Sequence, residues 1–254
     1  MIRIAALALL FLWPGLAVPQ NEGIVADLSQ RRVSITTTFT GSEIIIFGAV
    51  KRETPAAANE PLDVIITVSG PSQAVSVRKK DRVAGIWVNT QEQEVDSAPS
   101  FYAIMTSGPL GEILSETEDL RHRITTTKLI RAVDGGAEAD LEDFTEALIR
   151  IRKDEDVYQI NEGAVAFFDE TLFRSQVRLP ANLIEGAYET RIFLTREKEI
   201  VSMFTTQIDV SKVGLERLLY RLAHDRPLLY GIMSLAIAIA AGWLASAAFR
   251  LLRT

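Results

Sequence analysis

The sequence predicts a mainly β protein. We expect an immunoglobulin-like β-sandwich ectodomain with an inserted helical hairpin, followed by one C-terminal transmembrane helix. Three observations support this fold class. Short Val-, Ile- and Thr-rich segments, broken by Gly, Pro, Asn and Asp, fill most of 24–107 and 163–210. An acidic segment with helical periodicity separates them, and an uncharged stretch long enough to span a bilayer lies near the C-terminus.

Composition excludes several classes of function. The chain has 254 residues, a formal net charge of −6, two histidines and no cysteine. Without cysteine it has no disulfide, no thiol nucleophile and no zinc–thiolate site. Two histidines leave little room for a multi-histidine metal site, and we expect no cofactor. A pI of about 5.2 argues against nucleic acid as a partner, because binding to phosphates requires a basic face.

The N-terminus has the pattern of a secretory signal peptide. Arg3 precedes an uncharged run from Ile4 to Val18, and the small residues Gly15 and Ala17 end it. We therefore predict a signal peptide over 1–17, cleaved after Ala17. An uncleaved N-terminal anchor is the alternative, although the run is short for a spanning helix and contains a proline.

Two β-rich parts, 18–108 and 159–211, are expected to form the sandwich. Either the second part completes the first, which we favour, or two small β-domains lie side by side. The strands expected in the first part are Arg32–Thr38, Glu43–Val50, Asp63–Ser69, Ala74–Lys79, Ala84–Thr90 and Phe101–Thr106. Those expected in the second are Ala164–Phe168, Leu172–Leu179, Ala187–Thr195 and Glu199–Val210, the last two forming a hairpin.

The segment 109–158 is predicted to be a helical insertion. Ser115 and Glu118 have capping-box spacing, which predicts a helix from Glu116 to Val133. A second helix is expected over Glu138–Lys153, with carboxylates near its start and cations near its end.

Tyr188 is predicted to make a structural corner. The segment Leu179–Tyr188 resembles the loop before the penultimate strand of many immunoglobulin-like domains, where a tyrosine hydroxyl bonds back to the loop. This role is structural and involves no chemistry.

The C-terminal segments predict a membrane anchor. Residues 212–226 are expected to form an amphipathic juxtamembrane helix whose Arg217, Arg221 and Arg226 make a basic collar, and 227–249 the transmembrane helix. Packing of the amphipathic helix against the soluble body is the alternative to a place on the membrane surface. Residues 250–254 are then a short cytoplasmic tail. The basic flank favours the reverse orientation by the positive-inside rule, but the signal peptide requires the body outside, in the bacterial periplasm. With both ends and the collar set aside, residues 18–211 carry a net charge of −11.

Three segments carry a family resemblance. They are His224–Gly231 with Gly242-Trp243-Leu244 behind it, Val83–Asn89, and Ala98–Ala103. With the signal peptide and the anchor, they resemble the alphaproteobacterial putative transmembrane protein family over essentially the whole chain. The resemblance implies a single-pass protein of the cell envelope and brings no established activity, cofactor or catalytic residue.

Two features suggest contacts with partners. Trp87 is the best candidate for an exposed aromatic on a partner surface, with burial in the sandwich core as the alternative. Small residues that permit close helix packing recur every four residues in the anchor, at Ser234, Ala238, Gly242 and Ser246.

The sequence leaves two functions open. The first is a non-enzymatic, membrane-anchored periplasmic accessory protein that contacts lipid through its anchor and binds another envelope membrane protein or a second copy. The second is a periplasmic hydrolase that uses carboxylates, or a ligand-binding protein. An exposed apolar patch would favour the first function, and a polar cleft with convergent carboxylates the second.

Overall fold

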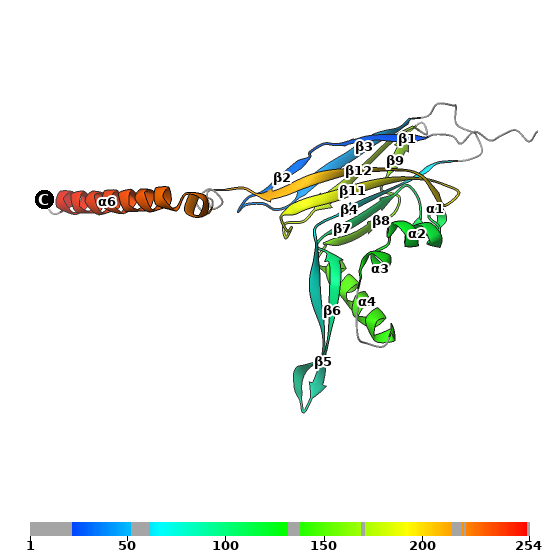
Figure 1. Cartoon of the computed structure of the whole chain (residues 1–254), viewed down its shortest axis with the longest axis horizontal. Coiled ribbons are helices and arrows are strands. Elements are labelled where there is room, and N and C mark those ends of the chain that lie inside the picture. Colours follow the sequence, from blue (N-terminus) through cyan, green and yellow to red (C-terminus); the bar gives the residue numbers. More distant parts are fainter. Residues whose placement is uncertain are drawn as a thin grey trace, which may run out of the picture.

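The protein is mainly β, with two packed sheets, a projecting hairpin, a helical segment and one long C-terminal helix (Figure 1). The computed structural model describes residues 22–51, 61–131, 138–168, 171–214, 220 and 222–252. The predicted fold class is confirmed in its β-rich body and its apolar C-terminal helix. The predicted signal peptide lies outside the described residues, and so do residues 215–219 and 221 of the predicted juxtamembrane helix.

A four-stranded antiparallel sheet forms one layer, in the order β1-β3-β10-β9. Alternate residues of each strand face inward, and this period of two produces the strict burial pattern of β10. The strands are β1 (Gly23–Leu28), β3 (Ser42–Lys51), β9 (Ala166–Phe168) and β10 (Leu172–Leu179).

A six-stranded sheet forms the second layer, in the order β2-β12-β11-β4-β7-β8. Its pairs are antiparallel except β2–β12 and β7–β8, which are parallel. The strands are β2 (Arg32–Ile35), β4 (Asp63–Ser69), β7 (Tyr102–Thr106), β8 (Tyr158–Asn161), β11 (Gly186–Arg196) and β12 (Glu199–Lys212).

The strand order can be compared with that of an immunoglobulin-type sandwich. If β1, β3, β10 and β9 are strands A, B, E and D, then β4, β11 and β12 are C, F and G. β7 adds to the C edge as in the variable type, whereas β8 pairs parallel to it after the helical segment. Strands from both β-rich parts of the sequence therefore share both sheets.

The core lies between the two sheets and is apolar. Ile44 and Ile46 of β3, Val177 of β10 and Ile66 and Ile192 of the second sheet are all fully buried. Gly48 faces the same interior, opposite Phe173 in the register. A Cβ at Gly48 would lie 2.5 Å from the Phe173 ring and 2.6 Å from the Val25 carbonyl oxygen, so only glycine leaves room for this ring.

Four helices lie between β7 and β8 among the residues that the structure describes, which makes the predicted continuous helix over 116–133 wrong. They are α1 (Leu110–Ile113), α2 (Glu116–His122), α3 (Thr126–Leu129) and α4 (Glu138–Asp154). α2 ends at Arg123, which has a left-handed backbone conformation. The Asp119 carboxylate causes this break, because it accepts hydrogen bonds from the Ile124 and Thr125 backbone amides and the Thr125 hydroxyl.

A two-stranded hairpin, β5 (Ser72–Val83) and β6 (Ile86–Pro99), projects from the sandwich (Figure 1). Its two-residue turn is Ala84-Gly85, with φ of 51° and 90°. The predicted strand over Ala84–Thr90 was therefore wrong at its start, because alanine rarely adopts positive φ and its presence concealed the turn. Strands β1 and β8 were not predicted.

We predict that Gly48→Ala destabilises the sandwich by about 1–3 kcal/mol, because the added methyl overlaps Phe173 and backbone. The free energy of unfolding is measured on the full chain in detergent by near-ultraviolet circular dichroism. Gly111→Ala is the matched control, since a Cβ at Gly111 has no neighbour within 4 Å. Equal stability of the two variants would show that the ring is not packed over Gly48.

Candidate functional site

The candidate site is the outer surface of the four-stranded sheet, where apolar side chains line up across all four strands. The registers place Phe168 beside Leu172, Leu172 beside Ala49, and Ala49 beside Val25. Phe47 lies in the neighbouring row, between Arg174 and Asp27. We call Val25, Phe47, Ala49, Phe168 and Leu172 the apolar face. It exists because these strands place apolar residues on the outward positions of their alternation as well as on the inward ones.

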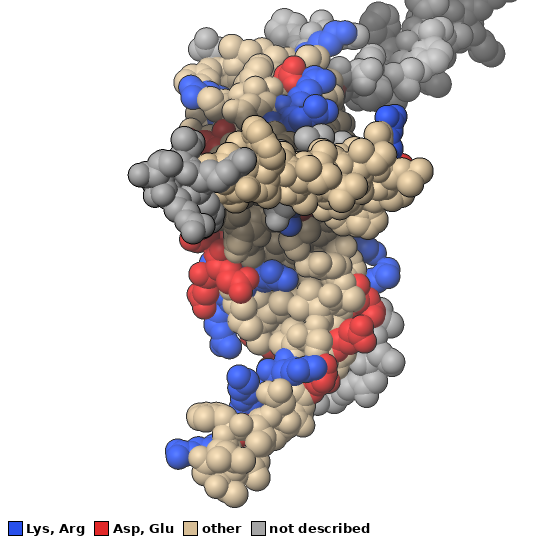
Figure 2. Space-filling view, turned by 90° about the vertical axis from the view of Figure 1, so that its left-hand side faces the viewer, with Lys and Arg blue, Asp and Glu red and all other residues tan. Residues whose placement is uncertain are grey.

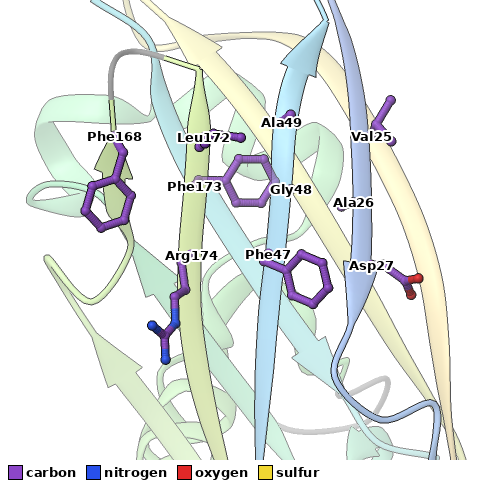
Figure 3. A pocket seen from close by; sticks show the side chains of 10 residues that line it. All are labelled: Val25, Ala26, Asp27, Phe47, Gly48, Ala49, Phe168, Leu172, Phe173 and Arg174. Carbon is purple, nitrogen blue, oxygen red and sulfur yellow. The ribbon is translucent and has the colours of Figure 1, made fainter.

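The apolar face is largely open to solvent. Val25 is 62% exposed, Phe168 and Leu172 are each 54% exposed, and Phe47 is 44% exposed. Together with neighbouring backbone they line a shallow, open hollow of about 560 Å³ (Figure 3). A contiguous exposed patch of this kind is characteristic of a surface that another molecule covers, whereas single exposed apolar residues are ordinary.

Two charges flank Phe47 at the margin of the hollow (Figure 3). Asp27 accepts hydrogen bonds from the Leu28 backbone amide at 2.8 Å and from the Arg31 guanidinium at 2.9 and 3.0 Å. The Leu28 amide and, after it, the Arg31 guanidinium lower the pKa of this exposed carboxyl, so Asp27 is ionised at neutral pH. Arg174 is exposed on the neighbouring strand. An apolar centre with a charged margin is the usual plan of a protein interface.

Part of the outer face of the six-stranded sheet, over β7 and β11, is covered by the helical segment instead. Arg191 of β11 donates to the backbone carbonyl of His122 at 2.8 Å, and the Tyr102 hydroxyl donates to the Ile124 carbonyl at 2.6 Å. The His122 ring lies edge-on to Phe193, with ring centroids 5.6 Å apart. These contacts hold α2 and the loop after it against the sheet. The outer faces of the two sheets therefore differ in how far other described residues cover them.

The buried tyrosines of this region are structural. Burial raises the pKa of Tyr102 to about 12 and also raises the pKa of Tyr158. Each hydroxyl donates to a backbone carbonyl, Tyr102 to Ile124 and Tyr158 to Pro99. Both phenols therefore stay protonated at neutral pH and are unsuited to proton transfer there.

Among the described residues, the lining of the hollow does not offer the groups that hydrolysis by paired carboxylates requires. Its charged lining residues are one acid, Asp27, and one base, Arg174. Within the described parts of the chain, no three His, Asp or Glu side chains gather closely enough to hold a metal ion. The geometry is suited to contact with an apolar surface.

The C-terminal helix completes the described architecture. α6 (Pro227–Leu252) contains the one helix segment, among described residues, that is long and apolar enough to cross a membrane, Pro227–Ala248. A family described as "Putative transmembrane protein (Alph_Pro_TM)" matches residues 23–251. The chain belongs to this family. No curated protein matches its sequence.

The residues singled out from the sequence lie at separate places in this family member. Trp87 is 69% exposed near the turn of the β5–β6 hairpin. Tyr188 is buried at the start of β11, and its hydroxyl donates to the Ile184 carbonyl at 2.8 Å. Arg226 is exposed just before α6, whereas Arg217 and Arg221 lie outside the described residues. The remaining four are exposed along α6: Ser234, Ala238, Gly242 and Ser246.

Sequence reasoning missed the apolar face, although one signal was available. Ile44-Ile45-Ile46-Phe47 and Phe167-Phe168 are continuous apolar runs on strands that bury only one face. Such a run must place apolar side chains outward. The sequence could not show that the outward residues of four strands align. This alignment depends on how the strands pair, and the paired strands lie far apart in the chain.

We predict that Tyr188→Phe lowers the free energy of unfolding by about 0.5–1.5 kcal/mol, because the Ile184 carbonyl loses its hydrogen bond from the phenol. Denaturant titration of the full chain in detergent measures this. Tyr220→Phe, on a ring that is 64% exposed and outside the sandwich, should leave the midpoint unchanged. A Tyr188→Phe variant as stable as the parent would exclude a stabilising corner.

Proposed function

We propose that this protein is a membrane-anchored accessory protein that binds another envelope membrane protein through its apolar face. The observation that supports this is the aligned, exposed set of Val25, Phe47, Phe168 and Leu172 on a sheet surface that the described part of the helical segment leaves open. Covering one such side chain is worth about 1.5–3 kcal/mol, so a few of them are sufficient for specific binding.

The proposed location is the bacterial inner membrane, with the β-rich body in the periplasm. α6 passes once through the bilayer, and the residues after it form a short cytoplasmic tail. The signal-peptide pattern of 1–17 and the length and apolarity of α6 support this orientation. A partner in the same membrane meets the apolar face at a high effective concentration, so a modest intrinsic affinity is enough.

A small apolar ligand is the second candidate, because the hollow has the volume of a small-molecule site. The hollow is shallow and open, however, whereas such sites usually enclose most of their ligand. We therefore favour a protein surface as the occupant.

The decisive experiment replaces the apolar face without touching the core. In-cell crosslinking followed by purification in mild detergent should recover a membrane protein with the parent chain, and at least about tenfold less of it with Phe47→Ser plus Leu172→Ser. Met203→Ser plus Val201→Ser is the matched control, because both are exposed residues of β12 in the other sheet. All chains should unfold at similar temperatures, since the exposed side chains contribute little to folding.

Two outcomes would contradict this function. Recovery of free monomer alone from the parent chain after crosslinking would oppose an accessory role. Equal loss of the recovered protein with the apolar-face and β12 variants would show that binding does not use this surface.

The small residues of α6 form a second proposed contact, between transmembrane helices. Gly242→Leu should reduce crosslinking through the helix, because a leucine side chain separates two backbones that glycine allows to meet. Ala240→Leu, which points away from that side of the helix, is the control. If both variants crosslink like the parent, the stripe Ser234, Ala238, Gly242 and Ser246 has no role in pairing.

A further inference from the structure

We propose that the tip of the β5–β6 hairpin inserts into an anionic lipid surface and gives the body a second membrane contact beside α6. The hairpin tip is Val83, Ala84, Gly85, Ile86 and Trp87. This inference goes beyond the proposed partner binding. It requires α6 to be in the bilayer but does not involve the apolar face.

The hairpin tip is apolar and has no described neighbour that covers it. Trp87 is 69% exposed, Ile86 65% and Val83 52%. Val83 pairs with Ile86, and Arg82 pairs with Trp87, so the apolar side chains surround a two-residue turn. Because the two strands satisfy each other's backbone groups, the tip can enter a headgroup region with few unpaired amides.

Cations gather immediately behind the hairpin tip. Lys79, Lys80 and Arg82 are exposed on β5, and the one acid between them, Asp81, accepts a hydrogen bond from the Thr90 hydroxyl at 2.6 Å. Residues 79–91 carry a net charge of +2, in a body whose net charge over 18–211 is −11. Figure 2 shows these basic side chains along the arm above the mostly uncharged end. A basic segment on an acidic body is attracted to anionic lipid while the remainder is repelled.

The hairpin and the membrane helix leave the sandwich from the same end. Ser69, just before the hairpin, pairs with Glu189, and Gly186 at the start of β11 pairs with Val210 near the end of β12. Pro71, at the base of the hairpin, packs so closely on Gly186 that a Cβ there would lie 2.5 Å from its ring. The last strand before α6 therefore passes close to the root of the arm. From there the arm and α6 run in different directions (Figure 1).

The arm is long enough to extend past the sandwich. Val77 is the last buried residue of β5, and the six residues from Arg78 to Val83 extend about 20 Å at the usual rise of a strand. The ion pair of Arg78 with Glu92 at 3.0 Å and the bond from the Ser76 hydroxyl to Glu92 connect the two strands near the root of the arm.

The chemistry of the hairpin tip favours lipid over protein. Lysine is depleted in protein interfaces, whereas at a bilayer its aliphatic stem lies along apolar surface and its ammonium reaches the phosphates. Tryptophan prefers the same interfacial depth. A single apolar contact binds a membrane weakly, but here α6 already holds the chain at the surface, so a weak contact is sufficient.

The experiment uses the absence of native cysteine. The full chain with Ile86→Cys carries a polarity-sensitive dye and is reconstituted in nanodiscs of phosphatidylglycerol and phosphatidylcholine, or of phosphatidylcholine alone. We expect blue-shifted emission and quenching by spin-labelled lipid in the anionic discs, and much less of both in the neutral discs. Lys79→Ser plus Lys80→Ser should lower the ratio of inserted to free tips roughly thirtyfold.

Two controls make the outcome decisive. A dye at Glu199→Cys, in the β11–β12 turn at the other end of the sandwich, should show no quenching by lipid. Trp87→Ser in the Ile86→Cys chain should reduce quenching without changing the unfolding temperature, because Trp87 is exposed.

The proposal is overturned if the tip dye is quenched no more than the Glu199 dye. It is also overturned if neutral discs, or the lysine variant in anionic discs, give as much quenching as the parent tip in anionic discs. A dye that shifts only when membrane proteins are added, without quenching by lipid, would assign the tip to a protein partner. Because the discs contain no other protein, failure here leaves the proposed function of the apolar face unaffected.

Discussion

Strands that lie more than a hundred residues apart in the chain pair at the centre of both sheets, and the rest of the structure depends on these pairings. β3 pairs with β10, and β4 pairs with β11. The loop-closure entropy of such distant contacts must be offset by burial, because the chain has no cysteine to crosslink it. This requirement explains the density of the interior, where Phe173 fits only because position 48 carries no side chain.

The same pairings determine which surfaces remain free. The helical segment is inserted between β7 and β8, which form one side of the six-stranded sheet, so it packs on that sheet's outer face. The four-stranded sheet receives no such cover from the described residues. Apolar residues on its outward positions are therefore left exposed by the topology itself, and this exposure is the observation behind the proposed partner.

Local patterns in the sequence predicted much of this fold. The features that were not predicted depend on contacts that a local pattern does not show. The alternation in Leu172–Leu179 and the hairpin near Thr195–Lys198 are local, and both lie where expected. The break after α2 is different, because it depends on the Asp119 carboxylate, which accepts hydrogen bonds from the Ile124 and Thr125 amides. The local sign of this break is the β-branched run 124–127, whose residues are poor helix formers. The sequence showed that position 87 is a tryptophan, but it did not show whether this side chain is exposed. Its exposure depends on a turn at Ala84, and alanine rarely adopts the positive φ of that turn.

The two exposed apolar features act together if both are in use. A body held to a membrane through one helix keeps the freedom to tilt and rotate, and a partner must restrict that freedom when it binds. A second contact at the hairpin tip removes part of this entropy before the partner arrives. The apolar face is then presented in a narrower range of orientations, so the same few phenylalanine and leucine side chains support tighter binding. The charge distribution favours this proposed arrangement, because an acidic body is repelled by anionic lipid and a basic arm is attracted to it.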